Sequence, residues 1–173
     1  MRKPIVAGQF YEGSKERLLS QISECYSHPF GAGKQERRAV KLMILPHAGY
    51  PFSGPCATQG YARLARPNKI ILLGPSHAGF ATCVSEDSWE TPLGVVETEK
   101  ISEKTGIPVD EYGHGTEHSL EVQIPFLQAM FEEVPPIVPV MVSSDPVDTG
   151  RRLSQVYETG DTIIVSSDFT HYG

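Results

Sequence analysis

The stretch Ile70-Ile71-Leu72-Leu73-Gly74-Pro75-Ser76-His77 decides the fold, because a short uninterrupted apolar run leads directly into a turn that carries a histidine. Two other runs have the same form. Leu42-Met43-Ile44-Leu45 precedes Pro46-His47, and Ile163-Ile164-Val165 precedes Ser166-Ser167-Asp168-Phe169-Thr170-His171. Short continuous apolar runs are typical of buried strands in a parallel sheet. Because open α/β sheets bind ligands beyond the carboxyl ends of their strands, we expect the three histidines to converge there.

The first two histidines also share a local pattern, His47-Ala48-Gly49-Tyr50 and His77-Ala78-Gly79-Phe80. Glycine in such a turn permits a positive φ, which lets the backbone fold away while the ring points into a crevice. A lone histidine is as readily a hydrogen-bonded structural residue, but two copies of the pattern favour a site. Neutral imidazoles are ligands for Fe(II), Zn and Cu, so we predict a divalent metal bound by His47 and His77.

The rest of the chain alternates helical and strand patterns. Ser14 is placed to cap a helix in which Leu18 and Ile22 recur at helical spacing. A helix over residues 55–64 would connect the first two apolar runs as a β-α-β unit. Asp145-Pro146 signals a helix that continues to about residue 158. We expect the strands at residues 40–45, 69–73, 137–142 and 162–165.

Two further segments have mixed patterns. Residues 89–96 combine turn formers with β-branched residues, which predicts a turn into a strand at the edge of the sheet. Over residues 117–133, apolar residues at i, i+4, i+7 and i+11 predict an amphipathic helix. Pro125 interrupts this helix, so we expect either a kink or a start closer to Pro125. Together the patterns predict an α/β fold with a mostly parallel or mixed central sheet flanked by helices.

The composition is that of a globular chain of ordinary size. With 173 residues, 39% hydrophobic and 21% charged, the chain shows no sign of disorder or of a membrane protein, and we expect one domain over residues 1–173. Met1-Arg2-Lys3-Pro4 precedes an apolar stretch too short for a signal peptide, which favours a cytoplasmic location. A loop rich in candidate site groups is an unusual end for a domain, so we also expect a C-terminal truncation.

Charge and cysteine content argue against several function classes. A net charge of −6 and a pI near 5.5 leave no basic surface for nucleic acid. Cys25, Cys56 and Cys83 are widely spaced and odd in number, which indicates reduced thiols. Cys56 near the His47 loop is a candidate nucleophile, but a buried apolar cysteine is favoured. Gly31-Ala32-Gly33 precedes a strand instead of following one, so no phosphate-binding loop is predicted.

Other imidazole and carboxylate groups extend the candidate site. Asp168 lies three residues before His171, and this pair would supply either a carboxylate ligand or an acid/base pair beside a metal. Asp168 could instead cap the following turn. His118 lies between Glu117 and Glu121 at the start of the predicted helix. These residues form either a solvated acidic first turn or a group in which His118 and Glu121 face the crevice.

Five segments resemble the Memo-like family, also called AmmeMemoRadiSam system protein B. They span the whole chain, and their combination is specific although each segment alone is weak. The segments are Ala7-Gly8-Gln9-Phe10-Tyr11, Pro46-His47-Ala48-Gly49-Tyr50 with Ser53-Gly54, Leu73-Gly74-Pro75-Ser76-His77, Glu117-His118-Ser119-Leu120-Glu121 with Pro125, and Val165-Ser166-Ser167-Asp168-Phe169-Thr170-His171-Tyr172-Gly173.

The resemblance implies a fold akin to the class III extradiol dioxygenases, with a metal, iron favoured, held by His47 and His77. Family members complete the site with a cysteine nearer the C-terminus, which none of the three cysteines of this chain matches. The resemblance also implies association with a radical-SAM protein and an AMMECR1-like partner. The expected catalytic residues are Asp168, His171 and His118, and the expected ligand-binding residues are Phe10 and Glu121.

Two functions of different classes remain open. The first is a metal-dependent redox or oxygenase-like activity with non-haem iron, in which Asp168 and His171 orient ligands and move protons. The alternative is a non-enzymatic binding module that uses the same pocket for a phosphopeptide or a small anionic ligand. A hydrolytic zinc enzyme is a weaker third option, because a histidine pair alone does not select among metals.

Overall fold

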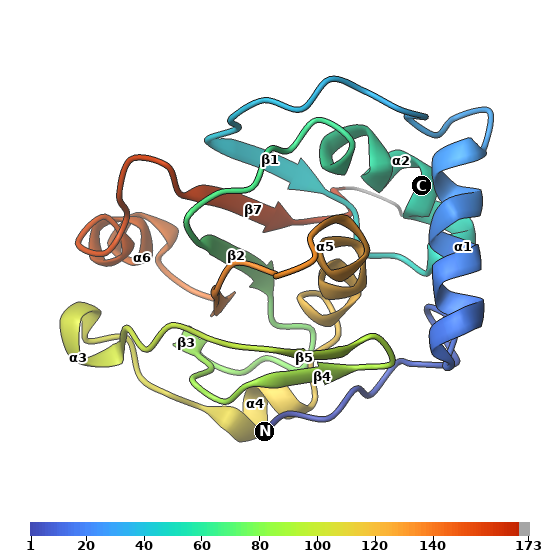
Figure 1. The fold of residues 1–173 in the computed structure, drawn as a ribbon. Coiled ribbons are helices and arrows are strands. Elements are labelled where there is room, and N and C mark those ends of the chain that lie inside the picture. The colour runs from blue at the N-terminus through green and yellow to red at the C-terminus, as the bar shows by residue number, and fades with distance from the viewer. Residues whose placement is uncertain (170–173) are drawn as a thin grey trace.

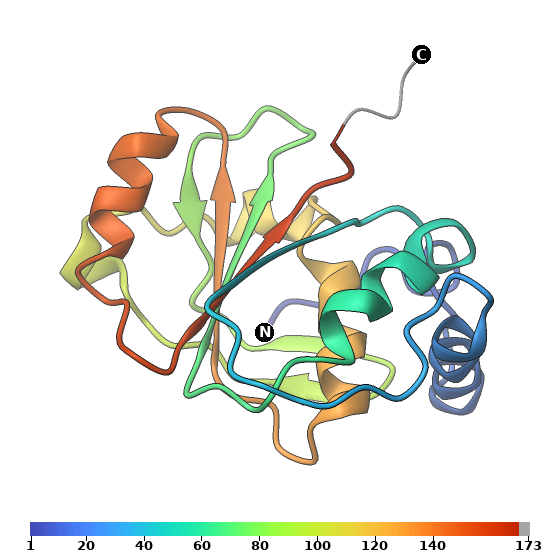
Figure 2. The same ribbon diagram turned by 90° about the horizontal axis from the view of Figure 1, so that it is seen from above.

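A five-stranded sheet forms the centre of the computed structural model, which describes residues 1–169 (Figures 1 and 2). The strand order is β1-β7-β2-β6-β3. Neighbours from β1 to β6 are parallel, and β3 joins β6 antiparallel, so the sheet is mixed and the predicted α/β class is confirmed. The strands are β1 (Leu42–Leu45), β2 (Ile70–Pro75), β3 (Cys83–Val84), β6 (Ile137–Val142) and β7 (Thr162–Ser166).

Helices cover both faces of this sheet, as Figure 2 shows in the view along its edge. On one face lie α1 (Lys15–Ser27), α2 (Tyr50–Tyr61) and α5 (Ile124–Met130). On the opposite face lie α6 (Pro146–Leu153) and the short α3 (Ser102–Thr105). The remaining short helical elements are α4 (Glu111–Gly115) and the 3-10 turn η1 (Glu121–Gln123).

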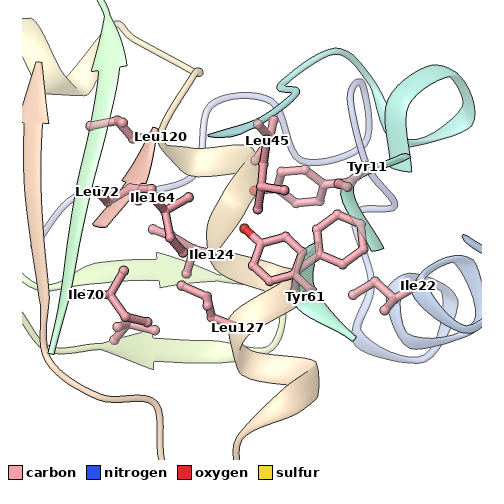
Figure 3. Packing of buried hydrophobic residues seen from close by; sticks show 14 of the residues in the cluster. Tyr11, Ile22, Leu45, Tyr61, Ile70, Leu72, Leu120, Ile124, Leu127 and Ile164 are labelled. Carbon is pink, nitrogen blue, oxygen red and sulfur yellow. The ribbon is translucent and has the colours of Figure 1, made fainter. Parts of the chain in front are cut away.

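The sequence of β2 begins with four consecutive apolar residues because the strand is covered on both faces of the sheet. Successive side chains of a strand point to opposite faces of a sheet. Ile70 and Leu72 therefore pack into the larger core cluster with Ile124 and Leu127 of α5, as Figure 3 shows. Ile71 points the other way, into the second cluster on the α6 side. Because both faces are covered, Ile70, Ile71 and Leu72 are fully buried and Leu73 is partly buried. Full burial of a large aliphatic side chain contributes roughly 1.5–3 kcal/mol.

The segment 89–96 forms a hairpin, so the prediction of one strand at the sheet edge is wrong. Its strands β4 (Trp89–Thr91) and β5 (Gly94–Val96) pair antiparallel in a separate two-stranded sheet. Gly94 has a φ of 124°, which non-glycine residues rarely adopt and which lets the chain fold back within two residues. The antiparallel edge strand of the main sheet is β3 instead.

Three helix boundaries differ from the sequence prediction. α2 begins at Tyr50, not near residue 55, because Pro51 occupies its first turn, where proline is favoured. In place of the helix predicted over residues 117–133, the structure has the shorter α5, with Pro125 in its first turn. Of the two alternatives for this proline, the start close to Pro125 is confirmed and the kink is wrong. α6 ends at Leu153, five residues early. Within residues 1–169, no helix is long and apolar enough to cross a bilayer.

The strand register places the candidate site. Leu45 of β1 lies opposite Ser166 of β7, and Leu73 of β2 lies opposite Val165. The loops that follow these three parallel strands therefore leave the sheet at the same edge.

Candidate metal centre

His47 follows β1 and is held by hydrogen bonds that define its protonation. Its buried ring places Nδ1 3.0 Å from Ser166 Oγ. The Ser166 hydroxyl donates its only proton to the Ser119 carbonyl at 2.6 Å, so Nδ1 of His47 must be the donor to Oγ. Gln123 Nε2 donates to the same Oγ at 2.8 Å and to the Pro46 carbonyl at 2.9 Å. This network leaves the lone pair of His47 on Nε2, free for a metal.

His77 follows β2 and is oriented by the buried carboxylate of Glu117. The ring Nδ1 lies 2.9 Å from Glu117 Oε1, and the backbone N–H of His77 donates to Oε2 at 2.6 Å. The N–H groups of His118 and Ser119 both donate to Oε1 at 2.8 Å. Burial by itself would raise the pKa of Glu117, but these hydrogen bonds lower it to about 2. The carboxylate therefore holds Nδ1–H of His77 and leaves Nε2 free.

His118 brings a third imidazole to the site from the segment that precedes η1. Its ring stacks on His77 with centroids 4.6 Å apart and lies 5.9 Å from the His47 ring. Phe10 packs against its side at 4.7 Å. Burial lowers the pKa of both His47 and His118 below the ordinary value of 6.5. Both rings therefore remain neutral at pH 7, as metal coordination requires.

The donor set fits a metal ion. One possible ligand atom from each of His47, His77 and His118 lies within 4.8 Å of the other two. Two of these rings have Nδ1 engaged by a neighbour, which is the usual arrangement around ligating histidines. Three imidazoles suit Fe(II), Zn or Cu, and the set does not identify the metal. In the described part of the chain, this cluster includes no cysteine.

Asp168 lies at the mouth of the same pocket. Its Oδ1 accepts the N–H groups of His47 at 2.5 Å and Ala48 at 3.1 Å, so it fixes the His47 loop. Its Oδ2 lies 3.8 Å from His47 Nε2. The carboxylate is therefore both an anchor for a backbone segment and a group beside the free nitrogen. The pocket has a volume of about 370 Å³ and is lined by Phe10, His47, Ala48, Gly49, His77, His118 and Asp168.

The sequence pattern allowed His118 and Glu121 to face the crevice together, but in the structure the two side chains have different surroundings. His118 faces the pocket, whereas the fully buried Glu121 carboxylate forms an ion pair with Arg2 at 2.8 Å and is not among the lining residues. The predicted position of His171 lies outside the described residues. Cys56 is exposed, so the prediction that it is buried is wrong, whereas Cys25 and Cys83 are buried.

Sequence reasoning missed three residues that orient the imidazoles: Ser166, Gln123 and Glu117. Ser166 had a detectable signal, because it occupies the inward-facing position of β7 after Thr162 and Ile164, where a polar side chain needs a partner. Glu117 had a weaker signal as an acidic residue just before the N–H groups of His118 and Ser119. Gln123 had none, because its partners lie on β7 and on the loop after β1.

The whole chain matches known proteins. The family model described as Memo-like protein matches residues 2–173. A MEMO1 family protein of Nitrosopumilus maritimus is 41% identical over 191 residues, which cover 99% of this chain and 69% of the relative. Similar proteins of Aquifex aeolicus (41% over 186 residues, 99% and 68%) and Sulfurisphaera tokodaii (37% over 199 residues, 99% and 70%) carry the same description. The chain therefore belongs to the Memo-like family.

Proposed function

We propose that this chain binds a divalent metal, Fe(II) favoured, through His47, His77 and His118, and that the site supports a redox or oxygenase-like reaction. The observation that carries the proposal is the convergence of three imidazoles whose ligand atoms lie within 4.8 Å of one another. A resident Fe(II) would supply Lewis acidity and one-electron chemistry at this position. His47 and His77 are the ligands expected from the sequence resemblance, and we include His118 because its ring lies beside them.

The protein groups around the histidines have separate tasks in this proposal. Asp168 Oδ2, 3.8 Å from His47 Nε2, is placed to accept a proton from a ligand in the pocket or to orient it. Phe10 packs on one side of the His118 ring and covers that part of it. The predicted part of His171 is to share the proton transfer with Asp168. The AMMECR1-like and radical-SAM partners stay predictions of the resemblance.

A second candidate is a binding module without turnover. The pocket of about 370 Å³ falls within the range of small-ligand sites, and imidazole rings line it on several sides. In this alternative the pocket would bind a phosphopeptide or a small anionic ligand through imidazoles that take up a proton, because Nε2 of His47 and of His77 otherwise presents a lone pair. In this function, binding would be independent of metal.

Metal reconstitution tests the first function. Purified protein is stripped with chelator, loaded anaerobically with Fe(II), Zn(II) or Co(II), desalted and analysed for metal content. We expect about one equivalent in the wild type, and a loss of at least tenfold in affinity for His47→Ala, His77→Ala and His118→Ala, because each removes one ligand. His28→Ala is the matched control, since His28 is exposed, its ring accepts a hydrogen bond from the nearby Phe30 N–H, and it is not among the residues that line the pocket.

Two results decide between the candidates. Metal retained at one equivalent by the triple variant His47→Ala, His77→Ala, His118→Ala would contradict the metal site. Titration with a phosphopeptide, with and without chelator, then tests the module. Binding that is unaffected by chelator would favour the module, and binding that requires the metal would favour the first function.

A further inference from the structure

Arg2 is a buried cation whose contacts converge on one segment of the chain. It is 5% exposed, and its guanidinium lies 4.0 Å above the centroid of the Trp89 ring. Nε donates to the His114 carbonyl at 2.8 Å, and Nη2 donates to the Glu117 carbonyl at 2.7 Å. Nη2 also lies 2.8 Å from Glu121 Oε2. A planar fork with several donors meets these acceptors together, which a lysine ammonium cannot do.

The acceptors of Arg2 span residues 114–121, the segment that carries the metal-site groups. Glu117, which orients His77, lies inside this segment, and His118 follows it directly. The segment is irregular between α4 and η1, so regular helix or sheet bonds do not fix its course. Arg2 supplies fixed points at its start, middle and end. A displacement of about 1 Å there would misplace the imidazole of His118.

Glu121 extends the same network to the opposite wall of the pocket. Its carboxylate accepts the N–H groups of Ile5 at 3.0 Å and Val6 at 3.0 Å and the Tyr11 hydroxyl at 2.7 Å. These bonds attach the N-terminal segment that carries Phe10, which packs on His118. The Arg2–Glu121 pair therefore joins the two segments whose side chains meet at the pocket.

We propose that Arg2 is a positioning residue of the metal centre, acting through Glu117 and His118, with Glu121 as its buried counter-charge. The inference rests on the proposed metal-binding function. It assigns Glu121 to holding the pocket walls in register, not to contact with the ligand. Removing the fork takes one donor from each of the His114 and Glu117 carbonyls and leaves the buried Glu121 carboxylate without its counter-charge, which loosens the segment locally.

The test compares Arg2→Met with Lys3→Met, a matched control in which an adjacent, exposed cation is removed. Metal affinity is measured by Co(II) titration, and amide hydrogen exchange is measured on the chelator-treated protein. For Arg2→Met we expect affinity to fall about 10- to 100-fold, as for other groups that orient ligands. We also expect faster exchange at His77, His118 and Ser119, whose N–H groups donate to Glu117. Lys3→Met should change neither.

Each outcome decides the inference. Unchanged affinity and exchange at these three amides would overturn it, and so would an exchange increase spread evenly over β2 and β6, which would mean a general structural role. If Arg2→Met does not fold, Arg2→Lys, which keeps the charge but not the fork, is measured in the same way and should show the same local effects. If the wild type binds no metal, the proposed function fails, and the exchange pattern alone still tests the positioning role.

Discussion

Ser166 controls which nitrogen of His47 is free, because its single proton is already donated to Ser119. Ser166→Ala removes the acceptor for His47 Nδ1–H and one partner of Gln123. We expect metal affinity to fall about 10- to 100-fold, since the ring loses the contact that fixes its tautomer. Competition titration with a chromophoric chelator measures the change. Ser23→Ala on the exposed side of α1 is the control, and equal affinities for both variants would contradict the role given to Ser166.

His114 is a buried imidazole with one unsatisfied nitrogen. The ring is 0% exposed, Nε2 lies 3.3 Å from the Cys83 carbonyl, and Nδ1 has no partner in the described structure. Burial lowers its pKa below 6.5. The unfolded chain therefore binds a proton at this residue at a pH where the folded chain does not. The free energy of unfolding therefore decreases as the pH falls below 6.5, whereas above that pH His114 is neutral in both states and causes no loss.

We therefore expect His114→Phe to flatten the loss of stability between pH 6.5 and pH 5. Each unit by which the pKa of His114 is lower in the folded than in the unfolded state costs about 1.4 kcal/mol of stability once the residue is protonated, and this cost produces the slope. Urea denaturation at a series of pH values measures it. Ser23→Ala, an exposed substitution that removes no titratable group, should keep the wild-type slope. A residual slope remains in His114→Phe, because the pKa values of His47 and His118 are also lowered. An unchanged slope in His114→Phe would show that this histidine is protonated equally in both states.

Among the elements, the four parallel strands could be predicted to within two residues. Continuous apolar runs are a strong local signal when both faces of a sheet are covered, as they are for β2. The hairpin β4–β5 could not be predicted, because its strands are only three residues long and depend on the turn before Gly94 and on pairing with each other, not on a periodic apolar pattern. The segment around His118 had a helical pattern of apolar residues, yet the contacts of Glu117 and Arg2 hold it in an irregular form. Such long-range contacts leave no periodicity in the sequence.

The packing of α1 on α2 depends on one small residue. A Cβ built on Gly54 would lie 2.4 Å from the Sγ of Cys25, which is buried, whereas a Cβ on Gly150 of α6 would meet nothing within 4 Å. Alanine in a helix is more favourable than glycine by roughly 0.5–1 kcal/mol. We expect Gly150→Ala to gain this amount and Gly54→Ala to lose about 1–3 kcal/mol through overpacking. Chemical denaturation of the two variants measures both changes.

A compensating change separates the steric cause from others. Adding Cys25→Ala to Gly54→Ala removes the sulfur that the new methyl group would contact. The double variant should recover part of the lost stability. A gain in stability for Gly54→Ala alone would mean that the two helices separate at little cost.

Over the whole molecule, the site depends on segments that are distant in sequence. His47 and His77 lie where β1 and β2 end at one sheet edge, a placement that strand-end histidines and parallel pairing could predict. The position of His118 could not be predicted in this way, because it is fixed by packing against Phe10 and His77. A ligand that binds all three histidines would connect both strand ends with the segment before η1.

Because a metal held by His47, His77 and His118 would bind the folded arrangement of three separated segments, it should stabilise the whole fold by mass action. At a free metal concentration of 100 times Kd, the expected gain is about 2.7 kcal/mol, provided that the unfolded chain does not bind the ion. Thermal unfolding with and without Co(II) or Zn(II) measures this gain as an increase in Tm. With at least tenfold lower affinity, His77→Ala should reduce the gain to about 1.4 kcal/mol or less at the same metal concentration, whereas the control His28→Ala should keep it in full. An equal increase for His77→Ala would mean that the ion acts at another place on the protein.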